Sequence, residues 1–162
     1  MSESPIAIHF TLNGAARTVS VKPNLNLADL LREEFGLGGV KIGCDQGVCG
    51  ACTVLADGIP MAACASFAWQ AEGRALVTIE GLTKNGTLDP VQEAFKANSA
   101  FQCGYCTPGM ILLAKALLDR NPSPDRAEIV AWMQANICRC TGYQMIVEAV
   151  EDAARRRREA VG

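Results

Sequence analysis

The residues best suited to chemistry in this sequence are its cysteines. Cys44, Cys49 and Cys52 lie in one short glycine-rich stretch, and Cys64 follows further along the chain. The spacing C-x4-C-x2-C with a more distant fourth cysteine is typical of plant-type [2Fe-2S] clusters. Glycines let a backbone fold round an inorganic core and turn its N–H groups toward sulfur, because they tolerate positive φ. The stretch therefore predicts a cluster-binding loop.

A second group of four cysteines lies in the C-terminal half, as a C-x2-C pair and a C-x-C pair: Cys103, Cys106, Cys138 and Cys140. Each pair follows Ala-Asn and precedes a threonine, Thr107 or Thr141, and an expected helix. Two such helical hairpins would bring four thiols together at helix N-termini, whose partial positive charge favours an anionic iron-thiolate cluster. On spacing alone, a zinc site with four thiolate ligands remains the alternative here.

Composition and cysteine use favour metal over disulfides. The chain has 162 residues and eight cysteines, and its first apolar run lacks the basic start and cleavage site of a signal peptide. A reducing, cytoplasmic location is expected, in which such cysteines bind metal; export to the periplasm with a partner that carries the signal stays open. Cys138 and Cys140 are also too close in sequence to form two bridges without strain.

Charge and hydropathy exclude other classes. The net charge is −2, with 20% charged and 49% hydrophobic residues, so nothing indicates nucleic-acid or membrane-surface binding. No stretch reaches the length of a membrane span. The sequence has neither a Ser-His-Asp set nor the C-x-x-C-H motif of haem attachment, and its single histidine, His9, falls in an expected strand. The glycine cluster Gly36–Gly39 follows a helix, which argues against dinucleotide binding.

The elements expected in the first half form a small mixed sheet crossed by one helix. Strands are expected over residues 5–12 and 17–21 around an Asn-Gly turn, over 53–56 and 59–63 around an Asp-Gly turn, and over 75–79. Asn26 is expected to cap a helix that begins at Leu27 and ends at the glycines after Phe35.

Four helices are expected in the second half. Asp89 caps and Pro90 starts the first, with Gln92 completing a capping box. Thr107, Ser123 and Thr141 are expected to open the other three, and the last runs into the arginines 155–158 as a solvated helix end. We therefore predict a first domain over residues 1–80, a connector over 81–88 and a helical domain over 89–162.

Two segments carry a resemblance to a known family. Residues 101–110 read FQCGYCTPGM, residues 136–143 read NICRCTGY, and the first loop contains Gly50-Ala51-Cys52-Thr53-Val54. In these motifs the sequence resembles the iron-sulfur small subunit of the xanthine oxidase family of molybdenum hydroxylases, over about residues 6–150.

The resemblance implies an α+β fold, with an N-terminal ferredoxin-like β-grasp domain and a C-terminal four-helix domain, each binding one [2Fe-2S] cluster. It implies that the distal cluster is bound by Cys44, Cys49, Cys52 and Cys64. It implies that the proximal cluster is bound by Cys103, Cys106, Cys138 and Cys140. Gln102 and Cys140 are implied to contact a molybdopterin, in its cytosine dinucleotide form, held by a separate large subunit.

The implied function is electron transfer during hydroxylation of an aldehyde or N-heteroaromatic substrate by that large subunit. The chain would be part of an oxidoreductase without carrying substrate chemistry, and FAD is not expected in it. Its acceptor would be a flavin subunit, a cytochrome or another carrier. The alternative is a free-standing ferredoxin-like carrier or iron-sulfur sensor, for which a more acidic chain is expected; a zinc-stabilised interaction module is a third possibility.

Overall fold

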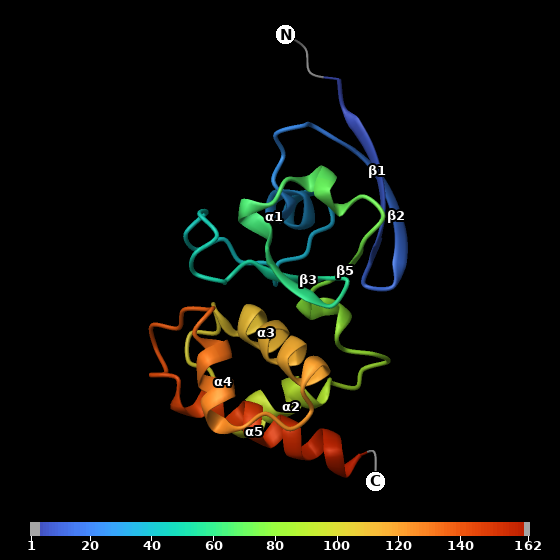
Figure 1. The fold of residues 1–162 in the computed structure, drawn as a ribbon. Helices are drawn as coiled ribbons and strands as arrows, with labels where there is room; N and C mark the ends of the chain where they lie inside the picture. The colour runs from blue at the N-terminus through green and yellow to red at the C-terminus, as the bar shows by residue number, and fades with distance from the viewer. Residues whose placement is uncertain (1–3, 161–162) are drawn as a thin grey trace.

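The protein consists of a small β-sheet part followed by a four-helix part. The structure, a computed structural model, describes residues 4–160. In Figure 1 the sheet and its covering segments lie above the helices, and α5 lies at the end of the molecule opposite β1. Because α3 contacts β3 directly, the two parts share a packed boundary.

The sheet is mixed and has five strands in the order β2-β1-β5-β3-β4. The strands are β1 (Ile6–Leu12), β2 (Ala15–Val21), β3 (Thr53–Ala56), β4 (Ile59–Ala62) and β5 (Ala75–Val77). β1 and β5 are parallel, whereas the other neighbours are antiparallel. The expected mixed sheet is confirmed.

Two tight turns connect the hairpins. Asn13 and Gly14 join β1 to β2 with φ of 52° and 84°, and Asp57 and Gly58 join β3 to β4 with φ of 53° and 81°. Positive φ at both central residues matches the twist of the flanking strands. The hairpins expected from the Asn-Gly and Asp-Gly pairs are therefore confirmed.

A helical segment covers the sheet, but only its first turn is α-helical. Asn26 Oδ1 accepts a hydrogen bond from Asp29 N at 2.7 Å, so the expected cap is confirmed at the start of α1 (Leu27–Asp29). The following turn, Leu30–Glu34, is a wider π-helix. Leu30 and Leu31 in it are fully buried in the core of the sheet part.

The second part contains four helices around one apolar core. They are α2 (Pro90–Ala97), α3 (Thr107–Arg120), α4 (Arg126–Met133) and α5 (Gln144–Glu159). α3 is apolar on nearly every face because it lies against β3 as well as against α2 and α4. The four expected helices are confirmed within the described residues.

The helix caps are only partly as expected. Asp89 Oδ1 accepts from Val91 N at 2.9 Å and Gln92 completes the capping box, as predicted. The caps expected at Thr107, Ser123 and Thr141 are wrong. Cys106 occupies the N-cap of α3, Asp125 caps α4 by accepting from Glu128 N, and Tyr143 precedes α5 with φ of 69°. Thr141 is displaced because its hydroxyl bonds a cysteine sulfur, as described below.

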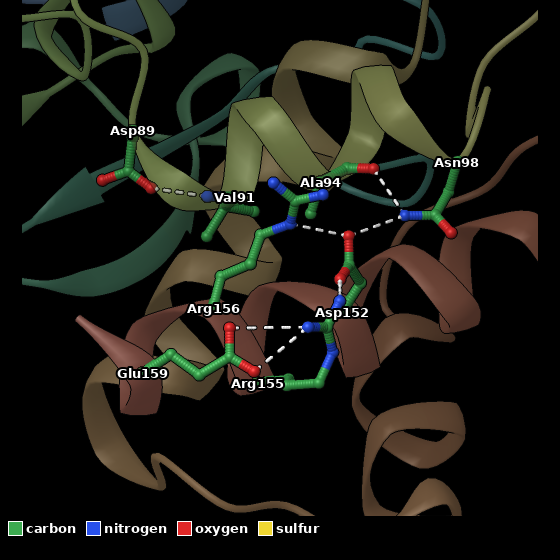
Figure 2. Close-up of polar contacts among 8 residues, drawn as sticks. All are labelled: Asp89, Val91, Ala94, Asn98, Asp152, Arg155, Arg156 and Glu159. Atoms are coloured by element: carbon green, nitrogen blue, oxygen red, sulfur yellow. Dashed lines mark hydrogen bonds and ion pairs between the residues drawn. The ribbon is translucent and has the colours of Figure 1, made fainter. Parts of the chain in front are cut away.

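A polar network holds α2 against α5. Figure 2 shows Asp152 between two partners: its Oδ2 accepts from Asn98 Nδ2 at 3.0 Å and from Arg156 Nε at 2.8 Å. Asn98 Nδ2 also donates to the carbonyl of Ala94, the last turn of α2. The expectation that the arginines form a merely solvated helix end is therefore wrong in part, since Arg156 bonds within this network and Arg157 reaches Asp119 of α3 at 2.7 Å.

No helix between residues 4 and 160 combines the length and the apolar character needed to cross a membrane.

Candidate metal centres

The loop between the π-helical turn and β3 carries three cysteines of the first group, Cys44, Cys49 and Cys52, and the fourth, Cys64, lies in the turn Ala63–Ala65 after β4. Asp45, Gly47 and Gly50 in the loop have φ of 56°, 72° and 70°, so the chain turns repeatedly in the left-handed region. A side chain on Gly43 would place its Cβ 3.1 Å from Cys49 Sγ. The loop thus needs glycine to bring backbone close to sulfur.

Backbone N–H groups in this loop point at the thiols. Cys44 Sγ accepts hydrogen bonds from the N–H groups of Gln46, Val48 and Cys49 at 3.3–3.4 Å. Cys64 Sγ accepts from Gly47 N at 3.3 Å. Such donors stabilise negative charge on sulfur, as a thiolate-bound metal site requires.

The protonation of the thiols follows from these contacts. The backbone N–H groups of Cys49, Gln46 and Val48 lower the pKa of Cys44 to about 6. Burial raises the pKa of Cys52 to about 11. Cys52 therefore holds its proton more tightly than Cys44, and a cation bound to its sulfur would favour the thiolate.

The second cysteine group lies where the loops before α3 and α5 meet. Cys140 Sγ is 3.6 Å from Cys103 Sγ. Cys138 Sγ lies 3.1 Å from Thr141 Oγ1, whose hydroxyl also accepts from Tyr143 N at 3.3 Å. The fold thus brings together cysteines from two separate helical hairpins, as the repeated pattern of Ala-Asn, two cysteines and a threonine predicted.

Charge at the second site is uneven. Burial raises the pKa of Cys106 to about 12. Burial also opposes ionisation of Cys138, but the hydrogen bonds from Thr141 and from the backbone outweigh it, and the pKa of Cys138 is lowered. Cys138 is therefore a thiolate more readily than its neighbour Cys106.

The thiols of each group are arranged as two pairs. In the second group Cys103 neighbours Cys140, and Cys106 interacts with Cys138. In the first group Cys49 N donates to Cys44 Sγ at 3.3 Å and Cys64 N donates to Cys52 Sγ at 3.4 Å, so these thiols also lie in two pairs. Among residues 4–160, no three Cys, His, Asp or Glu side chains gather as a single ion would require. Two pairs of thiols suit a two-iron cluster, in which each iron takes two cysteine sulfurs.

The two thiol groups are close neighbours across the boundary of the sheet and helical parts. Ile137, which directly precedes Cys138, donates its N–H to the carbonyl of Cys49 at 2.8 Å. A backbone hydrogen bond therefore links the two cysteine groups. Asn136, only 3% exposed, packs against Gly50, and its Oδ1 is 3.2 Å from Thr53 Oγ1. The two groups form one connected region.

An aromatic side chain also spans this region. Tyr105, between Cys103 and Cys106, donates its hydroxyl to the carbonyl of Ile42 at 2.8 Å. It lines a cavity of about 270 Å³ together with cysteines of both groups. Sequence reasoning missed Tyr105, Asn136 and Thr53, because only the fold brings these residues opposite the other loop; Gly50 was the one signal of close packing.

The side chains implied to contact a pterin lie at the surface. Gln102, Cys103 and Cys140 are exposed, whereas Cys52, Cys64 and Cys138 are buried. The second site therefore presents one edge to solvent. The described chain leaves this edge open to a partner.

Comparison with known proteins identifies both halves. Residues 10–76 match the family described as 2Fe-2S iron-sulfur cluster binding domain, and residues 78–151 match the family described as [2Fe-2S] binding domain. The zinc alternative for the helical half is therefore set aside.

Relatives match along nearly the whole chain. The nicotinate dehydrogenase small FeS subunit of Eubacterium barkeri is 51% identical, over 93% of this chain and 96% of the relative. The crystal structure of quinoline 2-oxidoreductase from Pseudomonas putida 86 has a chain that superposes with a TM-score of 0.92 at 46% identity, covering 96% of this chain and 98% of that one.

A longer relative contains the same unit. The aldehyde oxidoreductase from Desulfovibrio desulfuricans ATCC 27774 superposes with a TM-score of 0.91 at 45% identity, covering 94% of this chain but 17% of that one. The expected ferredoxin-like and four-helix architecture is confirmed by these matches. The chain belongs to the small iron-sulfur subunits of the xanthine oxidase family of molybdenum hydroxylases, and its role is that of an electron-transfer subunit.

Proposed function

We propose that the chain holds two [2Fe-2S] clusters in series between a molybdopterin centre on a partner large subunit and an external acceptor. A bound [2Fe-2S] cluster supplies one-electron chemistry, accepting and releasing single electrons. The distal cluster is assigned to Cys44, Cys49, Cys52 and Cys64. The proximal cluster is assigned to Cys103, Cys106, Cys138 and Cys140. In the division proposed here, residues 1–80 carry the distal site, 81–88 connect, and 89–162 carry the proximal site.

The observation that carries the proposal is the two-by-two pairing of the thiols in both groups. Each pair offers two sulfurs to one iron, and the N–H donors around Cys44 and Cys64 meet the negative charge on sulfur. Thr141 does the same for Cys138 at 3.1 Å. These contacts set how readily each site accepts an electron, because donors to sulfur stabilise the more negative state.

The exposed edge of the proximal site is assigned to the large subunit. Gln102 offers both a donor and an acceptor to the heteroatoms of a pterin, here proposed in its cytosine dinucleotide form. Cys140, exposed beside it, would shorten the distance from the pterin to the proximal site. Neither residue acts on substrate; both hold the partner's cofactor close.

The substrate class is proposed from the relatives. The names of three of them, nicotinate dehydrogenase, nicotine 6-hydroxylase and quinoline 2-oxidoreductase, refer to N-heteroaromatic compounds, and an aldehyde oxidoreductase is also similar. We propose hydroxylation of an N-heteroaromatic compound or an aldehyde by the large subunit, in the cytoplasm, with a flavin subunit or a cytochrome as acceptor.

Purification of the tagged chain from its native cells tests this function. We expect a large molybdenum-containing subunit to co-purify, and anaerobic addition of the substrate to bleach the visible absorbance of the clusters. A chain that purifies alone, carries iron but no molybdenum partner and exchanges electrons with several carriers would contradict the proposal.

A further inference from the structure

The space between the two thiol groups is bridged by one large side chain that reaches from one ligand loop to the other. Tyr105 lies between two proposed proximal ligands, Cys103 and Cys106, yet its hydroxyl donates to Ile42 O, two residues before Cys44 in the chain. The two ends of this hydrogen bond are 63 residues apart in sequence. The contact therefore joins the loops themselves.

The ring of Tyr105 packs where the opposite loop has no side chain. An ideal Cβ on Gly43 would lie 3.8 Å from a ring carbon of Tyr105, in van der Waals contact. Gly104, directly before the tyrosine, has φ of 79°, a conformation that turns this loop sharply. The ring thus lies within van der Waals reach of the backbone that carries Cys44.

The loops lead directly into α3 and β3, which pack against each other, but the loops themselves are irregular. Residues 36–52 and 99–106 contain no helix or strand. Beyond the packing of α3 on β3, discrete contacts fix their relative position: the backbone bond from Ile137 to Cys49, the packing of Asn136, and the tyrosine. Of these, only the tyrosine is a half-exposed side chain that can be changed without opening the core, since 47% of it is accessible.

From these contacts we infer that Tyr105 is a positioning residue, a tether that fixes the separation and mutual orientation of the two cluster sites. The inference rests on the proposed function, because it needs both sites to be occupied. Electron transfer and magnetic interaction between two paramagnetic centres both depend steeply on their separation, so a tether of this kind has a direct spectroscopic consequence.

The test compares three variants in the purified, cluster-loaded complex. Tyr105→Phe keeps the ring and removes only the hydroxyl, and Tyr105→Leu removes both contacts. Phe67→Leu is the matched control, because Phe67 is a similarly exposed aromatic, 47% accessible, that stacks on Trp69 away from the space between the thiols. The measurements are iron content and the magnetic interaction between the two reduced clusters by electron paramagnetic resonance.

We expect all three variants to keep full iron content. Loss of one hydrogen bond lowers the ratio of tethered to untethered loop arrangements by about fivefold. The spread of magnetic interaction strengths between the two clusters should accordingly widen in Tyr105→Phe. It should widen further, or the interaction should be lost, in Tyr105→Leu, and it should stay unchanged in Phe67→Leu.

An unchanged interaction in both tyrosine variants, with both clusters present, would overturn the tether. If Tyr105→Leu loses a cluster, the phenylalanine variant decides, since it retains the ring. Failure of the proposed function looks different: the unmodified protein would then purify without a molybdenum-containing partner, or would lack two iron-sulfur signals.

Discussion

The side-chain amide of Asn136 packs directly against the α-carbon of Gly50, so a residue two positions before Cys138 fills the space beside Cys49. A Cβ on Gly50 would overlap Asn136 Oδ1 and come within 2.9 Å of Asn136 Cα. Gly109 also packs against Gly50, because a Cβ on Gly109 would overlap the carbonyl oxygen of Gly50. The loops of the two sites meet at these three residues with no room for a further side chain.

Gly50→Ala tests this contact. The variant adds a backbone overlap to the cost of positive φ, and we expect a loss of more than about 3 kcal/mol in the free energy of unfolding. Gly58→Ala is the control, because Gly58 has φ of 81° but nothing within 4 Å of its ideal Cβ. It should cost only about 1 kcal/mol.

Thermal or denaturant unfolding of the two variants measures the difference. Equal losses in both would mean that the φ of Gly50 matters and its contact with Asn136 does not.

Thr141→Val should lower the reduction potential of the proximal cluster. The hydroxyl lies 3.1 Å from Cys138 Sγ, and its loss removes stabilisation of the reduced, more negative state. One hydrogen bond of ordinary net strength corresponds to roughly 40 mV for a one-electron couple. Redox titration followed by electron paramagnetic resonance gives the potential.

Thr107→Val is its natural control. The two threonines occupy equivalent places in the sequence, each directly after a cysteine, but Thr107 is the first residue of α3. A shift of the same size in both variants would show that the bond to Cys138 is not its cause.

Local turns and two of the helix caps could be predicted from the sequence, but the role of Thr141 could not. Turns set by Asn13-Gly14 and Asp57-Gly58, the caps at Asn26 and Asp89, and the strands beside them follow from local chemistry, and all were predictable. The role of Thr141 was not, because a hydroxyl can cap a helix or bond a sulfur, and only the tertiary position of Cys138 decides.

Asp152→Ala should destabilise the helical part by about 2 kcal/mol, because it removes the carboxylate that accepts from Asn98 and Arg156. Glu151→Ala, on the same helix, removes only an exposed pair with Arg126 and should change stability by less than about 1 kcal/mol. Comparable losses in the two variants would contradict the importance of the network in Figure 2.

The Asp152 effect should depend on pH with a definite sign. Burial opposes its ionisation, but Arg156 and Asn98 outweigh burial and hold the pKa of Asp152 below its usual range. A carboxyl whose folded pKa is depressed stabilises the fold above its unfolded pKa and loses that contribution as the pH falls through the folded value. The gap between unmodified protein and Asp152→Ala, measured by thermal unfolding, should narrow below about pH 4. A gap that stays constant in acid would contradict the charge-based explanation.

Gln102→Ala should leave both clusters intact and weaken the hold on the partner's cofactor. With one hydrogen bond lost at an exposed edge, we expect turnover or molybdenum retention to fall about fivefold. Gln144→Ala is the control, since Gln144 is also exposed but bonds Glu148 along its own helix. Unchanged turnover and unchanged molybdenum content would leave Gln102 without the proposed role.

The sequence likewise predicted the ligands of the candidate sites but not the contacts between the two sites. Cysteine spacing and the glycines beside it predicted two groups of four thiols, because ligand loops need both chemistry and bare backbone. That Tyr105 and Asn136 join the two groups depends on contacts across 63 residues or more, and such contacts have no local pattern.

Electron paramagnetic resonance of the reduced protein, compared with Cys64→Ser and Cys106→Ser, tests the central assignment most directly. The unmodified chain should bind about four iron atoms and give two distinguishable [2Fe-2S] signals. Each variant should lack a different one of these signals and keep the other. A single signal in the unmodified protein, or loss of the same signal in both variants, would contradict the assignment of two separate four-thiol sites.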